Sequence, residues 1–95
     1  MYVRVSPGHF SVAKYDDVVR MTQERLVPAL YHLPGFRGFQ GCVDRQAGKL
    51  LAISLWDTED QARALRDTIG DIIAQYQAIG AEFESPEIYE VAVQA

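Results

Sequence analysis

The alternation of hydrophobic and polar positions divides the first third of the chain into a strand and a helix. Tyr2 to Ser6 alternates with period two, which predicts a short strand that Pro7-Gly8 ends. Hydrophobic positions between Tyr15 and Leu33 then recur at spacings of three and four, which is the pattern of an amphipathic helix. Pro28 lies inside this pattern, so we expect a kink there, and Leu33-Pro34-Gly35 should end the helix.

The middle of the chain predicts a hairpin. Phe36 to Asp44 and Leu50 to Trp56 are strand-like runs, joined by the small and polar loop Arg45-Gln46-Ala47-Gly48. The second strand is apolar at nearly every position, so both of its faces carry hydrophobic side chains.

A second helix and a final strand complete the pattern. Thr58 to Gln61 fits a capping box, and the helix that follows should break in two at Gly70 and stop at Gly80. The stretch from Glu82 to Pro86 is predicted to cross over to the final strand, Ile88 to Val93.

The order strand, helix, strand, strand, helix, strand predicts an α+β fold of the ferredoxin-like βαββαβ type. Residues 1–95 form one domain, in which a four-stranded antiparallel sheet carries both helices on one face. Because two helices cover only one face, the apolar second face of Leu50 to Trp56 needs another partner. We therefore predict a two-fold homodimer with facing sheets.

Composition narrows the classes of partner. A formal net charge of −4 argues against nucleic-acid binding, and no apolar run is long enough for a membrane span. The N-terminus lacks a cationic region followed by an apolar one, so we expect no signal peptide. The single cysteine, Cys42, is interpreted as a small buried filler, and its lack of a disulfide partner favours a cytoplasmic setting. Without a His, Cys, Asp or Glu cluster at metal spacing, we expect no metal site.

Two fragments resemble a known family. Leu33-Pro-Gly-Phe-Arg-Gly-Phe39 and Ile53-Ser-Leu-Trp-Asp-Thr-Glu-Asp-Gln-Ala62 are similar to the antibiotic biosynthesis monooxygenases, which are small dimeric α+β barrel proteins. The resemblance implies a β-barrel at the dimer interface and a pocket between each sheet and its helices. Some members oxidise polycyclic phenols or quinol precursors with dioxygen and without cofactors, and a related branch degrades haem.

The haem-degrading branch has an Asn on the first strand, a Trp on the third and a His on the helix that follows. Trp56 matches the Trp, but this chain contains no Asn, and its histidines are His9 and His32. Haem degradation is therefore not expected.

Five residues are candidates for the site. The ring of Trp56 would stack on an aromatic substrate, unless it fills the core, which is the commoner place of a tryptophan. His9, in the loop after the first strand, is the candidate general base. Arg37 would hold an anionic oxygen of the substrate, unless it pairs with an acid across the hairpin or the dimer. Phe39 and Tyr76 are expected to contribute to the substrate-binding pocket.

The hairpin register stays open at this point. If Asp44 pairs with Lys49, Arg37 lies opposite Trp56 and Phe39 lies beside Ser54. A loop that differs by one residue would instead bring Phe36, Gln40 and Cys42 to that side.

The leading functional hypothesis is a cofactor-independent monooxygenase-like homodimer that acts on or binds a small aromatic or apolar molecule. The alternative is a dimeric, non-catalytic module that binds a small ligand or serves in a stress response.

Overall fold

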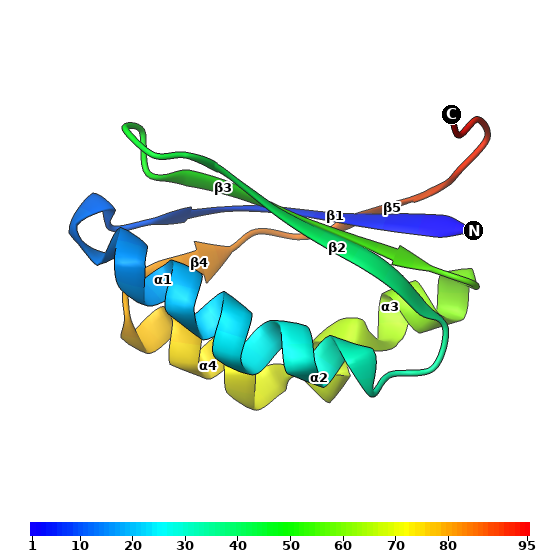
Figure 1. Ribbon diagram of the computed structural model, residues 1–95, viewed down its shortest axis with the longest axis horizontal. Helices are drawn as coiled ribbons and strands as arrows, with labels where there is room; N and C mark the ends of the chain where they lie inside the picture. The colour runs from blue at the N-terminus through cyan, green and yellow to red at the C-terminus, as the bar shows by residue number, and fades with distance from the viewer.

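The computed structural model describes all residues from 1 to 95, and the elements follow the predicted order (Figure 1). The elements are β1 (Tyr2–Phe10), the 3₁₀ turn η1 (Val12–Lys14), α1 (Tyr15–Met21), the π-helical turn η2 (Thr22–Leu26), α2 (Val27–Tyr31), β2 (Phe36–Asp44), β3 (Lys49–Trp56), α3 (Glu59–Thr68), α4 (Gly70–Ala78), β4 (Ala81–Phe83) and β5 (Glu87–Glu90). The strands form one antiparallel sheet in the order β2-β3-β1, with β4 and β5 both paired to the remaining edge of β1. The α+β, ferredoxin-like prediction is confirmed, with its last strand divided in two.

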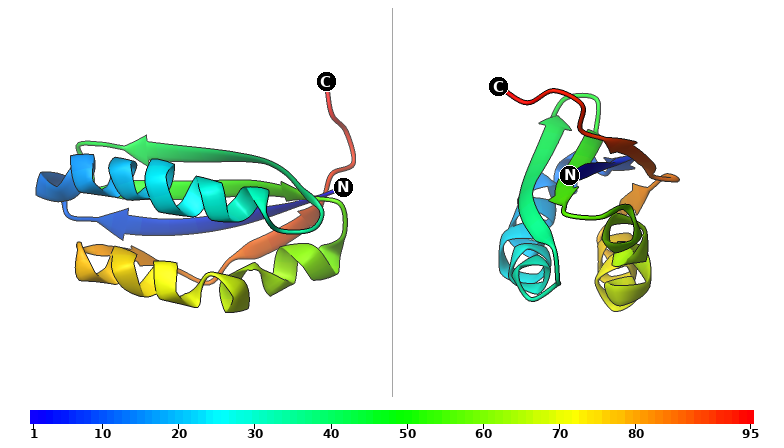
Figure 2. Two further views of the ribbon diagram at one scale, coloured as in Figure 1. Left: turned by 60° about the horizontal axis from the view of Figure 1, so that its bottom comes forward. Right: turned by 90° about the vertical axis from the view of Figure 1, so that its right-hand side faces the viewer.

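The two helical segments, α1 to α2 and α3 to α4, cover the same face of the sheet (Figure 2). The hydrophobic core lies between the sheet and these helices, and its largest fully buried side chains are Trp56, Tyr76 and Leu30. None of the helices is long and apolar enough to span a membrane.

The first strand is longer than predicted, because Pro7-Gly8 continues it. The carbonyl of Pro7 accepts a hydrogen bond from the N–H of Glu84 at 2.8 Å, and Gly8 pairs with Phe83 of β4. A Cβ at position 8 would lie only 2.3 Å from the Glu82 carbonyl oxygen. Glycine is therefore needed here for a close backbone approach, and it does not mark a strand end. His9 consequently belongs to β1, and its prediction as a loop residue is wrong.

The end of the chain also differs from the prediction. Residues 82 and 83 of the expected crossover belong to β4 (Ala81–Phe83), and the final strand is the short β5, Glu87–Glu90. Both strands pair with β1. They are two strands rather than one because the segment Glu84 to Pro86 lies between them.

The first helix is irregular ahead of Pro28. The N–H of Val27 donates to the carbonyl of Thr22, which closes a π-helical turn, and Pro28 follows in the first turn of α2. Proline has no N–H to donate within a helix, so a widened turn next to it is a common adjustment.

The second helix follows the prediction closely. Thr58 and Gln61 form a complete capping box, the helix divides into α3 and α4 at Gly70, and Gly80 ends it at a φ of 84°.

The hairpin adopts one of the two registers that the sequence left open. Asp44 pairs with Lys49 and Phe39 pairs with Ser54. A bulge between Phe36 and Gly38 then places Phe36, rather than Arg37, opposite Trp56. Arg37 is the extra residue of the bulge, and its side chain is exposed.

No helix covers the other face of the sheet (Figure 2). Pairs of apolar residues, Val5 with Ile53 and Val3 with Leu55, lie there on neighbouring strands. Cys42 is exposed, so the prediction that it is a buried filler is wrong for the single chain. The two-faced strand that the sequence indicated is thus present, with one face open.

Candidate functional site

A cavity lies between the sheet and the helices, in two adjoining parts. The larger part has a volume of about 270 Å³ and the narrower part about 60 Å³. Both parts are lined by the same five apolar or aromatic side chains, Leu26, Phe39, Ala52, Tyr76 and Phe83. A mainly apolar cavity of this size is close to the lower limit for small-molecule sites in proteins.

Tyr76 is held in place at the centre of this cavity. Its hydroxyl lies 2.6 Å from Oγ1 of Thr22, whose own hydroxyl donates to the Val18 carbonyl at 2.9 Å. Since threonine has one hydroxyl proton, Tyr76 donates to Thr22. Burial raises the pKa of Tyr76. Tyr76 is therefore a neutral phenol at neutral pH and does not serve as a base.

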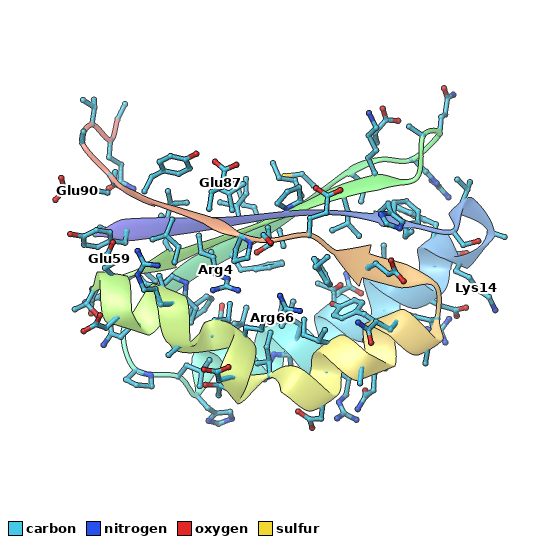
Figure 3. All side chains as sticks on the ribbon, turned by 180° about the vertical axis from the view of Figure 1, so that it is seen from behind. Arg4, Lys14, Glu59, Arg66, Glu87 and Glu90 are labelled. Atoms are coloured by element: carbon cyan, nitrogen blue, oxygen red, sulfur yellow. The ribbon has the colours of Figure 1, made fainter.

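The narrow part of the cavity carries positive charge. Arg4 reaches it from β1 and Arg66 from α3, and both side chains point into the gap between the sheet and the helices (Figure 3). Arg4 is only 6% exposed; its Nη1 donates to the Ala62 carbonyl at 2.8 Å, while its Nε has no hydrogen-bond partner. Burial lowers the pKa of Arg4, the nearby charge of Arg66 lowers it further, and Asp67 opposes the shift.

Trp56 does not line the cavity itself, but it bonds a residue that does. Its side chain is 1% exposed, packs against Phe36 with ring centroids 5.5 Å apart, and donates from Nε1 to the Ser54 hydroxyl at 2.8 Å. Ser54 lines the narrow part of the cavity, directly across from Arg4 in the ladder between β1 and β3. Trp56 thus fills the core, as one of its two interpretations predicted, and positions Ser54.

The remaining predicted site residues are divided between the cavity and the surface. Phe39 and Tyr76 line the cavity together. His9 is exposed, and its Nε2 lies 3.5 Å from a carboxylate oxygen of Glu82. Arg37 is exposed and binds Asp57 with Nε and Nη2, at 2.6 and 3.1 Å. Within one chain His9 and Arg37 therefore do not meet the cavity, and their roles stay predictions.

Sequence reasoning did not identify Arg4, Ser54 and Arg66 as site residues. The available signal was one arginine within a strand of period two, between Tyr2 and Ser6. That pattern does not say which face the helices cover, so it could not distinguish an arginine in a cavity from one in water. No group of three or more His, Cys, Asp or Glu residues is placed to hold a metal ion.

Comparisons with known proteins agree on the fold. Neither a protein-family model nor a curated protein sequence matches the chain. Among solved structures, an antibiotic biosynthesis monooxygenase is 15% identical with a TM-score of 0.71, over 99% of this chain and 100% of that one. The monooxygenase from the gene ActVA-Orf6 of Streptomyces coelicolor, in complex with nanaomycin D, is 13% identical with a TM-score of 0.70, over 99% and 91%.

A haem degrader shares the fold as well. MhuD from Mycobacterium tuberculosis, with two haems bound in its active site, is 18% identical with a TM-score of 0.72, over 100% of this chain and 99% of that one. At these identities the likeness extends to the arrangement of elements and not to a reaction. The resemblance seen in the sequence is thus confirmed at the level of architecture, and the chain has the fold of the antibiotic biosynthesis monooxygenase structures.

Proposed function

We propose that the protein binds a small aromatic molecule in the cavity beneath the sheet and oxidises it with dioxygen, without a metal or flavin. The observation that carries this proposal is the cavity itself, in which Phe39, Tyr76 and Phe83 present aromatic side chains around a mainly apolar space. The solved structures of the same fold include monooxygenases, which supports oxygenation as the reaction class.

In this chemistry the substrate supplies the electrons after it loses a proton. The cavity lining contains no histidine, and Glu84 is its one carboxylate. We assign Glu84, at the narrow part of the cavity, as the group that accepts the substrate proton. Tyr76 and Phe39 hold the ring.

A substitution that fills the cavity tests this proposal. Ala52 lines both parts of the cavity, so Ala52→Leu should occlude it with little cost to the fold. Binding of 2-naphthol, followed through the fluorescence of the single tryptophan, should weaken about tenfold, which corresponds to roughly 1.4 kcal/mol of lost contact. The control is Ala74→Leu on the exposed side of α4, which should bind as the wild type does. Equal binding by both variants would contradict a site in this cavity.

A non-catalytic binding module is the second candidate, and one observation favours it. Tyr76 is buried and kept neutral, so the centre of the cavity offers no base, and the only carboxylate of the lining is at one end. Oxygen consumption during incubation with electron-rich naphthols separates the two candidates. Uptake above the uncatalysed rate, lost in Glu84→Gln, supports the oxygenase; tight binding without uptake supports the module.

Haem degradation is the least supported alternative, because no histidine lines the cavity to ligate iron. Adding haem should leave its Soret band at the position of free haem. A red-shifted band that titrates to one haem per chain would contradict this expectation.

We further propose that the uncovered sheet face binds a second copy of the chain. The apolar pairs Val5 with Ile53 and Val3 with Leu55 form neighbouring rows there, next to Leu51. Contiguous apolar surface of this kind is rare on stable monomers, and a two-fold partner would bury it against an identical surface.

A further inference from the structure

We propose that the narrow part of the cavity is a carboxylate site, in which Nε and Nη2 of Arg4 bind the two oxygens of an aromatic acid. This inference rests on the proposed binding of an aromatic molecule in the same cavity, and it names the class of that molecule.

The buried side chain of Arg4 forms no ion pair within the chain. A buried guanidinium normally has a carboxylate partner, because an unpaired buried charge costs several kcal/mol of desolvation. The ion pairs of this molecule join other residues, and Nε of Arg4 is buried without any hydrogen-bond partner. The one hydrogen bond of its side chain runs from Nη1 to the Ala62 carbonyl. Arg4 is therefore a buried cation with which no carboxylate of the chain pairs.

One edge of the Arg4 guanidinium forms no hydrogen bond within the chain. Since Nη1 is directed to Ala62, the edge formed by Nε and Nη2 remains, and this edge matches the two oxygens of a carboxylate. The same molecule contains the completed form of this contact. Arg37 binds the Asp57 carboxylate through its own Nε and Nη2, at 2.6 and 3.1 Å. A ligand carboxylate would bind Arg4 as Asp57 binds Arg37.

The groups next to Arg4 are mainly hydrogen-bond donors and cations. The Ser54 oxygen accepts the bond from Trp56, so the Ser54 hydroxyl proton is free to donate next to Arg4. Ser6 lines the same space. Arg66, which Figure 3 shows near Arg4, lines it as well. The charged groups near Arg4 are Arg66, Asp67 and Glu84, of which Glu84 lines the cavity and forms none of the ion pairs. Donors thus predominate around Arg4, which favours an anion over a cation.

The aromatic lining of the cavity indicates which class of molecule carries the carboxylate. Phe39, Tyr76 and Phe83 line the narrow part together with Arg4, and they also line the larger part. A planar carboxylate at Arg4 would place a ring of one or two cycles against these three side chains. The ligand class is therefore an aromatic monocarboxylic acid.

The test compares two probes that differ in charge but not in shape, 2-naphthoate and 2-naphthamide. Calorimetry with the wild-type protein at neutral pH should give naphthoate about tenfold tighter binding or more, the value expected for a charge-assisted hydrogen-bonded pair. Equal affinities would overturn the carboxylate site and leave the aromatic cavity standing. Failure of both probes to bind would overturn the proposed function and the carboxylate site together.

Variants of Arg4 test whether this side chain causes the preference for naphthoate over naphthamide. Arg4→Met removes the charge at similar length, and Arg4→Lys keeps the charge but loses the two-pronged edge. Both should lose most of the preference for naphthoate while naphthamide binding stays within about twofold. The matched control is Arg63→Met, since Arg63 lies on α3 near Arg66 but pairs with Glu59 outside the cavity. A preference that persists in Arg4→Met overturns the site.

A measurement on the wild type remains decisive if a variant does not fold. In a nitrogen-15 spectrum of arginine side chains, a buried Nε–H signal should move when naphthoate is added and stay in place with naphthamide. No movement with naphthoate would overturn the contact with Arg4.

The negative charge of Glu84 allows a second test of whether the narrow part of the cavity favours anions. Because Glu84 carries a negative charge at the same cavity, Glu84→Gln should strengthen naphthoate binding and leave naphthamide binding unchanged. Weaker naphthoate binding in this variant would overturn the assignment of the narrow part as an anion site.

Discussion

Arg37 and Arg4 are strand arginines on either side of β3, and their surroundings are opposite. The bulge between Phe36 and Gly38 turns Arg37 out to solvent, where Asp57 binds it. Arg4 follows the regular alternation of β1 and is carried under the helices, where no carboxylate binds it. The residue that the sequence suggested for an anionic oxygen is thus already paired, and the residue with a free edge is one that the sequence did not single out.

The Arg37–Asp57 pair predicts a dependence of stability on pH. The hydrogen bond from Arg37 lowers the pKa of Asp57 below its unfolded value of about 3.9. The stabilisation is therefore complete above that value and is lost as the pH falls through the lower folded pKa. Arg37→Met should lower the thermal midpoint at pH 6, and the difference from wild type should shrink towards pH 2. Circular dichroism melts check this, and a difference that grows with acidity would contradict it.

The hydroxyl of Tyr76 should contribute measurably to stability. Tyr76→Phe removes its bond to Thr22 inside the core, which should cost about 1 kcal/mol of unfolding free energy. Tyr31→Phe is the matched control, because Tyr31 is 74% exposed. Urea unfolding measures both variants, and an equal effect of the two substitutions would contradict the proposed hydrogen bond.

At the scale of elements, β1 is the strand against which the end of the chain pairs. It pairs with β3 along its whole length and with both β4 and β5 on its other edge. Pro7-Gly8 would end many strands, but here the proline carbonyl bonds Glu84 and the glycine leaves room for the Glu82 backbone. A local breaker signal is overridden by pairing with a segment more than seventy residues away.

Gly8→Ala tests the close approach of β4. The added Cβ would collide with the backbone oxygen of Glu82, so we expect a loss of about 1–3 kcal/mol in unfolding free energy. Gly41→Ala in β2 is the control, since its Cβ would meet a side-chain atom of Phe39 at 3.4 Å, an ordinary contact. Urea denaturation of both variants measures the difference. Equal stability would mean that β4 does not approach β1 this closely.

At the scale of the whole molecule, the helices cover one face of the sheet and leave the other uncovered (Figure 2). One face is covered by the helices and encloses the cavity, while the other leaves Val3, Val5, Ile53 and Leu55 without cover. The second face is the basis of the proposed homodimer. Burying apolar surface yields roughly 25 cal/mol for each Å² removed from water, which favours association.

The dimer is tested by charging its proposed centre. Wild-type protein should sediment at about twice the chain mass of 10.7 kDa, and Ile53→Glu should shift it to the monomer. Ala74→Glu on the exposed side of α4 carries the same change in charge and should stay dimeric. A wild-type protein that sediments as a monomer across the micromolar range would contradict the proposal.

The sequence by itself determined the helices, the first three strands, the order of the elements and the fold class. These follow from local signals: period-two and period-three-to-four patterns, the capping box of Thr58 and Gln61, and the glycines at 70 and 80. The hydrophobic character of both faces of β3 was also readable, because it depends only on alternation along one strand.

Only the tertiary structure decided the strand ends, the bulge and the site. One bulge residue redirected Arg37, and the helix-covered face made Arg4 a buried cation instead of a solvated one. The physical reason is that a strand pattern defines two faces but does not say which is covered, and a single inserted residue reverses the side chains beyond it. The cavity between Arg4, Phe39 and Tyr76 exists only once residues from β1, β2 and α4 are packed together.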